Sequence, residues 1–409
     1  MINEKEIDKI IERLIKRIED ANEYFLMQIG SSLKKIRDLK PADAQKLIQI
    51  LKYGGKYDEI IKKISKYTDM NVKDIKAIFE AYSKRDLMFA EKFYKYRNIP
   101  FKKYTENIAL QNQTIALRRM VEKEVYNFSR TNILGYTIKD LRGNVQFLGL
   151  KETYNKVLDE ALLNVGQGKE SFDTALVNIL KEIGGSGLKT IEYASGRSMR
   201  LDSAIRMHLQ GRLRELHNEN QKLFGKEFDA DGIEISVHEN PAPDHASSQG
   251  RQFSKKEFDK LQAGKTAIDY KGISHNLDHD NKNGYRPISE MNCYHYVFSI
   301  VLGVSEPEYT DKELQEIIDR NEQGFEYEGK HYTMYEGTQL QRALERKIRE
   351  QKDIQILGRA SNNTEIIDDA QKQIKILTNK YNEVNKISGL PKKMDRLRVP
   401  NYRRVAIKK

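Results

Sequence analysis

Tryptophan is absent from this sequence, and only one cysteine, Cys293, and eight prolines occur among its 409 residues. A single cysteine excludes a disulfide within the chain and agrees with a reducing compartment. No apolar run approaches the roughly 18 residues that cross a bilayer, and the first twenty residues mix charged with apolar side chains at every turn. We therefore expect a protein made in the cytoplasm, with neither a signal peptide nor a membrane contact.

The charge is large but mixed. Lys and Arg total 71 against 60 Asp and Glu, which leaves a net charge of +11, and hydrophobic residues make up 38%. This composition is typical of a soluble, helix-rich protein with long solvated faces. It permits contact with nucleic acid or another acidic surface without requiring it.

Residues 1–130 are predicted to form helices throughout, punctuated by Pro41 and by Gly54-Gly55. Apolar residues recur at steps of three and four along the first helix, at Ile7, Ile11, Leu14, Ile18, Ala21 and Phe25. That spacing lays one apolar stripe along a helix. The stripe can serve the protein's own core or a partner helix, and the sequence leaves both open.

Residues 131–225 also favour helix. A helical pattern runs from Phe172 to Ile183, with Ser171 as its expected N-cap and Gly184-Gly185-Ser186-Gly187 as its expected end. A second pattern runs from Leu201 to Leu216. We expect this segment to lead into the next.

Residues 226–310 change period and predict a small α+β core. Ile233, Ile235 and Val237 alternate with polar residues, as in a half-buried strand, and a Pro/Ser/Gly-rich loop follows. A second strand is expected at 292–303, where Cys293 and His295 would share one face. The predicted fold class is therefore mainly α, with extended helical segments on either side of a small α+β core.

Residues 311–409 predict a hairpin turning at Glu328-Gly329-Lys330, then basic helices from about Gly337 and around 365–387, then a basic tail. Steps of four and three place three arginines on one helix face. Contacts with DNA or an acidic surface are assigned to these arginines and to the tail, at Arg342, Arg346, Arg349, Lys392, Lys393, Arg403 and Arg404.

A histidine and cysteine group is the most suggestive chemical feature. His238 ends the first predicted strand, His245 lies in the loop after it, and Cys293 and His295 follow on the second. Such a set can bind tetrahedral zinc, although its spacing matches no standard zinc finger. The alternative is that the histidines hydrogen-bond the loop while Cys293 fills the core. The sequence contains no G-x-S-x-G nucleophile elbow, no P-loop and no dinucleotide fingerprint.

Five blocks, in order, resemble the phage minor capsid protein 2 family, which is related to the head-morphogenesis group typified by the Mu F protein. They are EYASGRSMRLDSAIRM (192–207), EISVHENPAPDHASSQGRQFS (234–254), NCYH (292–295), GVSEPEYTDKEL (303–314) and YEGTQLQRALERKIREQK (335–352). The family usually carries W-Q-G after the loop histidine, whereas this chain has Ser248-Gln249-Gly250.

The resemblance implies a structural virion protein, without catalysis, bound near the portal protein and needed for head assembly or DNA delivery. Its partners would be the portal, other head proteins and packaged double-stranded DNA. We expect the core to be held together by a buried polar cluster of His238, Asp244, His245, Gly250, Asn292, Cys293 and His295. No cofactor is required by this reading, and a structural zinc is the one metal that the cluster could hold.

Two other functions stay open. A metal-dependent enzyme acting on nucleic acid would use the His/Cys group, and a packaging accessory without chemistry would bind DNA through the basic region after residue 336. Bound zinc with DNA nicking would indicate the first function, and steeply salt-dependent DNA binding the second.

Overall fold

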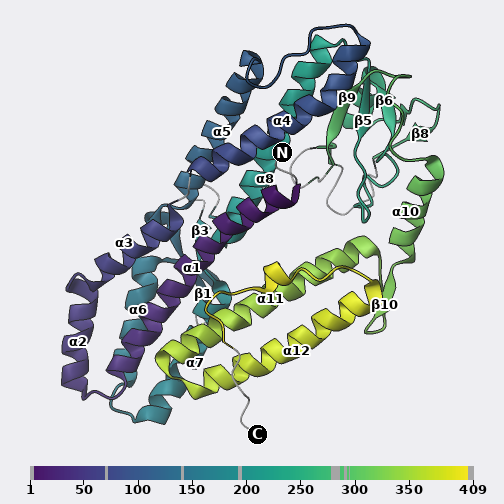
Figure 1. The fold of residues 1–409 in the computed structure, drawn as a ribbon. Helices are drawn as coiled ribbons and strands as arrows, with labels where there is room; N and C mark the ends of the chain where they lie inside the picture. The colour runs from purple at the N-terminus through teal and green to yellow at the C-terminus, as the bar shows by residue number, and fades with distance from the viewer. Residues whose placement is uncertain are drawn as a thin grey trace. The chain divides into compact units, whose positions relative to one another are not determined.

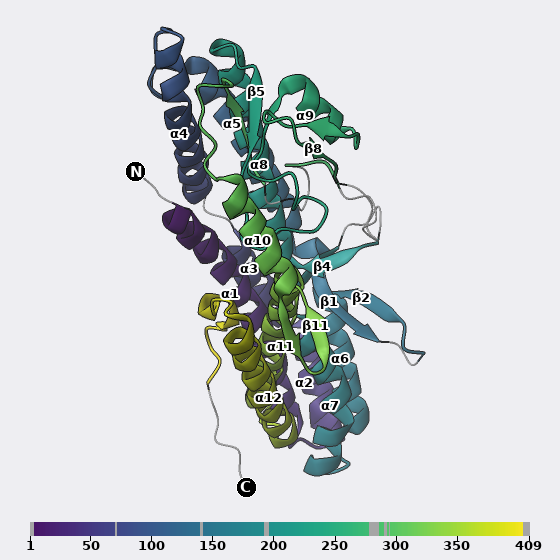
Figure 2. The same cartoon turned by 90° about the vertical axis from the view of Figure 1, so that its right-hand side faces the viewer.

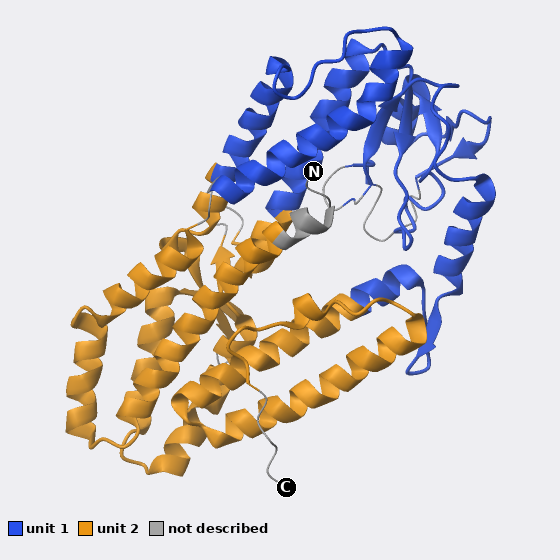
Figure 3. Ribbon diagram, viewed as in Figure 1, with its two compact units in different colours: residues 1–7, 72–122, 208–340 blue, residues 8–71, 123–207, 341–409 orange. Residues whose placement is uncertain are grey.

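A computed structural model describes residues 4–69, 72–139, 142–191, 196–277, 286–289, 293 and 295–403. The chain divides into two compact units, each assembled from separated stretches (Figure 3). Unit 1 comprises residues 1–7, 72–122 and 208–340, and unit 2 comprises residues 8–71, 123–207 and 341–409. The four segments expected from the sequence are continuous stretches of chain, whereas these units are interleaved.

Unit 2 is built mainly from helices (Figure 1). Its helices are most of α1 (Glu4–Ile36), α2 (Pro41–Tyr53), α3 (Lys56–Thr68), α6 (Leu150–Asn164), α7 (Lys169–Ser186), most of α11 (Met334–Ser361) and α12 (Thr364–Ser388), with the short turns η1 (Thr131–Ile133) and η2 (Met394–Leu397). Pro41 stands at the start of α2 and Gly54-Gly55 separates α2 from α3, as predicted.

The apolar stripe of α1 lies in the core of unit 2. Leu14 and Ile18 are at most 2% exposed and Phe25 is fully buried. Phe25 stacks on Tyr136 of β1, with ring centroids 5.3 Å apart. The question that the sequence left open is thus decided for the described part of the stripe, which serves the chain's own core; the side chain of Ile7 lies outside the described residues.

The predicted N-cap of α7 was wrong, whereas the helix ends within the predicted glycine-rich stretch. The helix begins at Lys169 after the N-cap Gly168, so Ser171 lies inside it. It continues through Gly184-Gly185 to Ser186, and Gly187 is its C-cap. A Cβ on Gly184 would stand 2.9 Å from Cα of Ile354 on α11. Glycine is therefore needed here for the close approach of two helices, and the packing outweighs its poor helix propensity.

A four-stranded sheet, in the order β2-β1-β3-β4, was not anticipated in residues 131–225. It consists of β1 (Leu134–Lys139), β2 (Val145–Gly149), β3 (Lys189–Ile191) and β4 (Ser198–Arg200), all antiparallel. In Figure 2 the β1–β2 hairpin extends away from the helices of this unit, and the residues at the start of β2 are exposed. Strands of three to six residues are too short to show a clear period, which is why the sequence did not reveal them.

Unit 1 combines helices with short strands. Its elements are α4 (Val72–Tyr96), most of α5 (Ile108–Phe128), most of α8 (Leu201–Glu227), β5 (Gly232–Ile235), β6 (Gln252–Ser254), α9 (Lys255–Gln262), β7 (Ala267–Ile268), β8 (Ser274–His275), β9 (Val297–Ile300), α10 (Asp311–Gln323), β10 (Phe325–Tyr327) and β11 (Lys330–Tyr332). The predicted hairpin at 328–330 is confirmed as β10–β11. Phe93 of α4 stacks on Phe228, with centroids 4.9 Å apart, and anchors the helical part of its core.

A three-stranded antiparallel sheet, β6-β5-β9, forms the predicted α+β core. Here Ile235 pairs with Val297 and Gly232 with Ile300. The second strand was predicted too long, because β9 begins at Val297 and Cys293 and His295 precede it. His238 likewise lies beyond the end of β5 at Ile235. The predicted class, mainly α with a small α+β portion, is confirmed.

Candidate functional site

The loop between β5 and β6 starts and ends at the same place on the sheet. The Gly250 N–H donates to the Ile235 carbonyl at 2.9 Å. Gly250 has φ +69°, and a Cβ there would stand 2.5 Å from the Leu314 side chain. Glycine alone fits both the left-handed backbone and this lack of space. The closure holds residues 236–249 over the sheet, with His245 in the middle.

His245 of this loop contacts Cys293, and both residues are buried. His245 is 1% exposed and Cys293 2%. Nδ1 of His245 lies 3.4 Å from Sγ of Cys293, and its Nε2 lies 2.8 Å from the Arg286 carbonyl oxygen. A carbonyl oxygen only accepts, so Nε2 is the protonated nitrogen of the neutral ring and Nδ1 presents a lone pair to the sulfur.

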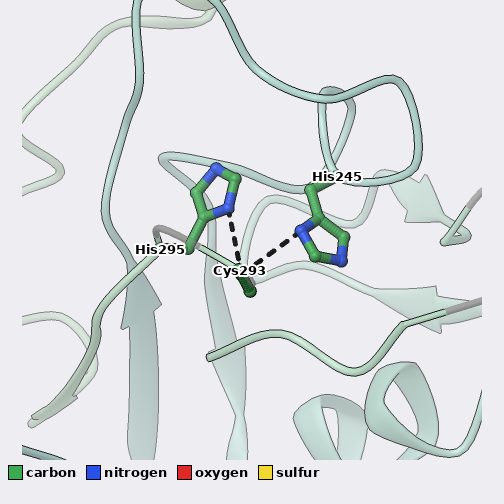
Figure 4. Close-up of side chains that lie close together, drawn as sticks. All are labelled: His245, Cys293 and His295. Carbon is green, nitrogen blue, oxygen red and sulfur yellow. Dashed lines mark hydrogen bonds between the residues drawn. The ribbon is translucent and has the colours of Figure 1, made fainter. Parts of the chain in front are cut away.

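His295 approaches the same sulfur from the other side (Figure 4). It is 2% exposed, and its Nδ1 lies 3.5 Å from Sγ of Cys293. Its Nε2 lies 3.2 Å from Oε1 of Gln249. The backbone N–H of His238 also donates to Oε1 at 2.8 Å, which identifies that atom as the oxygen. Nε2 of His295 therefore donates, and Nδ1 again presents a lone pair.

The cluster thus has three inner members, His245, Cys293 and His295, whose ligand-type atoms all lie within 4.8 Å of one another. His238 stands at its edge, with its ring centroid 4.6 Å from that of His295. The sequence predicted that these four residues come together, and the structure places them so. Asn292, also predicted for this cluster, lies outside the described residues.

Asp244 ties the loop to the segment before Cys293. It is fully buried, and Arg286 donates to both of its oxygens, from Nε at 2.7 Å and from a terminal nitrogen at 2.8 Å. This geometry compensates the buried carboxylate, and the contact raises the pKa of Arg286. Asp244 thus connects the loop to Arg286, a partner that the sequence did not suggest.

Burial and neighbouring charges change the pKa values of the residues in the cluster. Burial, together with the adjacent His238 and His245, lowers the pKa of His295 to about 2, so this ring stays neutral. Burial alone would raise the pKa of the Cys293 thiol, but the contact with His245 outweighs it and lowers that pKa. The same contact raises the pKa of His245 against the effect of burial. Cys293 is thus more easily ionised than an ordinary thiol, although a sulfur that is 2% exposed lies beyond the reach of a substrate.

The comparison with protein families now decides the identity. The model of the family described as phage minor capsid protein 2 matches residues 2–384. The chain belongs to this family. It is a minor capsid protein of a bacteriophage virion, and its interactions are with other proteins of the phage head. No curated protein and no solved structure matches the chain. Within its described residues the minor capsid protein has no helix that is both long and apolar enough to span a membrane.

A second buried polar group in unit 1 of the minor capsid protein was missed. Nδ1 of His217 lies 2.9 Å from Asp86, and its Nε2 lies 2.9 Å from the Val297 carbonyl oxygen. Asn220 donates to the other oxygen of Asp86 at 3.0 Å. Despite burial, these contacts lower the pKa of Asp86. Asp86 lies more than 130 positions before His217 and Asn220 in the chain. The one signal in the sequence that could have indicated this group is a polar residue on the apolar face of α8.

The arginine stripe of α11 divides between surface and interior. Arg346 is exposed and Arg342 partly so. Arg349, by contrast, pairs with Asp202 at 2.7 Å and Glu19 at 3.4 Å inside unit 2, which contradicts its expected role in contacting DNA. The expectation failed because a helix side that carries charge can pair internally as well as face solvent.

The basic C-terminal stretch is anchored along its backbone through Arg403. Gln341 donates to the Pro391 carbonyl at 2.9 Å and Gln355 to the Arg403 carbonyl at 3.0 Å. The side chains of Lys392, Lys393 and Arg403 remain exposed. The predicted tail is thus a docked segment that displays basic side chains, and Arg404 lies outside the described residues.

Proposed function

We propose that this minor capsid protein is a structural component of the portal vertex, inside the head, that supports head morphogenesis or DNA delivery and does not act as an enzyme. The observation that carries the proposal is the family match over residues 2–384, which includes parts of both compact units. A match of this extent supports a structural role for the chain as a whole. The buried His/Cys cluster fits an architectural role, because its polar atoms bond to one another and to the loop backbone.

The first test is where the protein lies in the virion. Heads would be assembled with a small epitope tag on the protein, labelled with gold-conjugated antibody after mild opening, and imaged. Label at one vertex, together with co-purification of the portal protein with the full chain, is the expected result. Label spread over the shell, or a virion without the protein, would contradict the proposal.

A rigid apolar tip in unit 1 offers a surface for such a head-protein contact. The β7–β8 hairpin exposes Ile268 (47%), Tyr270 (55%) and Ile273 (43%) within six residues. The carboxylate of Asp269 accepts the backbone N–H groups of Lys271 and Ile273, both at 2.9 Å, so the turn between the strands is held in one form. Clustered apolar side chains on a preorganised turn are typical of a protein interface.

This surface defines a variant for the portal pull-down. The variant Ile268→Ser with Ile273→Ser should reduce portal recovery at least about tenfold, as the loss of two interface anchors would. Its matched control is Ile50→Ser with Tyr53→Ser, which changes two exposed apolar residues of α2. Equal losses in both variants, or none in the hairpin variant, would remove the hairpin from the interface.

Contact with packaged DNA is a second function that an observation favours, namely the exposed basic side chains on the anchored C-terminal segment. Lys392→Ser with Lys393→Ser and Arg403→Ser should weaken double-stranded DNA binding and lower its salt dependence by about 2–3 in the log–log slope. Lys312→Ser, at a lysine that is 85% exposed on α10, is the control. An unchanged slope in the triple variant would leave this segment without a DNA role.

The competing function, a metal-dependent enzyme acting on nucleic acid, is addressed with the same preparation. Incubation of supercoiled DNA with the zinc-loaded chain should leave it uncut. Nicking that disappears in Cys293→Ser would favour the enzyme over the structural protein.

A further inference from the structure

We propose that His245, Cys293 and His295 bind one zinc ion, with His238 completing the site. The starting observation is that Nδ1 of both inner histidines points at one sulfur (Figure 4). The two sulfur–nitrogen distances are 3.4 and 3.5 Å. In a tetrahedral zinc site with Zn–N near 2.05 Å and Zn–S near 2.3 Å, a sulfur and a nitrogen ligand stand about 3.5 Å apart. The two sulfur–nitrogen separations therefore already match those of a tetrahedral zinc site.

Proton counting supports a cation at this position. Both Nε2 atoms donate to oxygens, so both neutral rings present a lone pair to Sγ. A thiol has one proton and can satisfy only one of them. A divalent cation satisfies all three ligand atoms at once, and the proton of the Cys293 thiol is released to solvent as the thiolate binds.

The surroundings are those of a metal centre. In protein metal sites, a ligating histidine donates its other N–H to a carbonyl or carboxylate, which fixes the ring. Here the Arg286 carbonyl does this for His245, and Oε1 of Gln249 does it for His295. The Ser289 backbone N–H donates to Sγ at 3.2 Å, which favours the thiolate form that zinc requires.

His238 is assigned the fourth position. Its ring centroid lies 4.6 Å from that of His295, whereas its own ligand atoms are not part of the group within 4.8 Å. Binding of zinc by His238 would therefore require its side chain to move toward the three inner ligands.

The test uses the untagged full chain, purified without chelator, and measures metal by mass spectrometry and by titration with Zn²⁺ and Co²⁺. We expect one zinc per chain. Co²⁺ should give a thiolate charge-transfer band in the near ultraviolet and intense visible bands of a tetrahedral centre. Saturating zinc at about 100 times Kd should raise Tm by about 5–10 °C. A metal-free wild-type chain with no Co²⁺ band and no Tm shift would overturn the proposal.

Variants separate this site from adventitious binding. Cys293→Ser and His295→Ala should each weaken zinc more than about 100-fold, and Gln249→Leu, which removes only the acceptor for His295, by about 10–100-fold. His238→Ala should cost at least tenfold, and an unchanged affinity would remove it from the fourth position. His331→Ala, at an exposed histidine of the β10–β11 hairpin, is the control. Zinc retained in both Cys293→Ser and His295→Ala would place the metal elsewhere and refute the site. The Co²⁺ spectrum of the wild-type chain tests the proposal even if a variant fails to fold.

Discussion

At the scale of single residues, the core of unit 1 depends on polar groups that are buried and mutually bonded. Asp244 is fully buried against Arg286, and His245 links the Arg286 carbonyl to Cys293. Removing one member leaves its partners desolvated without a bond, which costs more than the bond itself contributed. Such residues determine which packing of the loop is stable.

His245→Ala should therefore destabilise the core at 226–310. We expect a loss of about 2–4 kcal/mol in the free energy of unfolding, because two buried contacts and a large side chain are removed. Urea unfolding of the chelator-treated chain measures this effect apart from any metal. His331→Ala should change it by less than about 0.5 kcal/mol. An unchanged melting temperature in His245→Ala would count against the architectural role.

Glu19 makes the stability of unit 2 depend on pH. Burial raises its pKa from 4.5 to about 8 against the effect of Arg349, and the negative charges of Asp202 and Asp353 raise it further. A carboxyl whose pKa is higher in the folded than in the unfolded state makes its full contribution to the stability of the folded state below about pH 4.5. That contribution is lost as pH rises to about 8.

Glu19→Gln mimics the protonated acid and should remove this loss. Relative to wild type, the variant should be similar near pH 4.5 and more stable by up to about 4 kcal/mol near pH 8, as a pKa change from 4.5 to about 8 implies. Chemical unfolding at several pH values measures the difference. Comparing the two proteins cancels the other raised carboxyls, Glu23 and Asp353. Parallel stability curves would show that Glu19 is ionised in the folded protein.

At the scale of elements, close helix contacts in unit 2 depend on glycine. A Cβ on Gly30 of α1 would stand 2.5 Å from Cβ of Ala360 on α11, and a Cβ on Gly184 of α7 would stand 2.8 Å from the Ile354 side chain. Larger side chains would force α11 away from these helices and lose the contacts between them. Glycines that resemble helix breaks in the sequence thus mark the places where helices meet.

Two neighbouring glycines of α7 give a matched pair. Gly184→Ala should cost about 1–3 kcal/mol, because its Cβ would lie 2.8–2.9 Å from atoms of Ile354. Gly185→Ala should stabilise by up to about 1 kcal/mol, because its Cβ would have only an ordinary contact at 3.8 Å and alanine favours helix. Thermal unfolding of both variants checks the opposite signs. The same sign in both would refute the packing role of Gly184.

At the scale of the whole molecule, chain order and spatial order differ. Each unit combines three separate stretches of the chain, so neither can form before residues far apart in sequence have met. The docked C-terminal segment is part of this arrangement. Leu397 and Val399 are 6% and 8% exposed, and the buried carboxylate of Glu23 on α1 accepts the Asn401 backbone N–H at 3.0 Å.

The C-terminal segment should therefore stabilise unit 2. Leu397→Ala with Val399→Ala should lower the free energy of unfolding by about 2–4 kcal/mol, since two buried side chains are truncated. Lys392→Ala with Lys393→Ala, at exposed side chains a few residues earlier, should be near neutral. Denaturant titration of the two double variants compares them. If residues 392–399 were instead a free basic tail, neither double variant would change the free energy of unfolding.

From its sequence alone, this protein could be assigned to the mainly α class, given a hairpin at 328–330, and matched to a capsid family. Helix periodicity, turn residues and ordered motifs are local properties, so they can be recognised without knowledge of the fold. The meeting of His238, His245, Cys293 and His295 was also anticipated, because they lie in or beside two predicted strands.

Only the tertiary structure decided the rest. The sheet of β1–β4 depends on pairing between strands of three to six residues, which carry little local signal. Likewise, Arg349 faces the interior because Asp202 and Glu19 are there to pair with it, and Gly184 stays helical because Ile354 of α11 packs against it. In each case the deciding energy comes from a partner far away in the chain, which no local pattern can display.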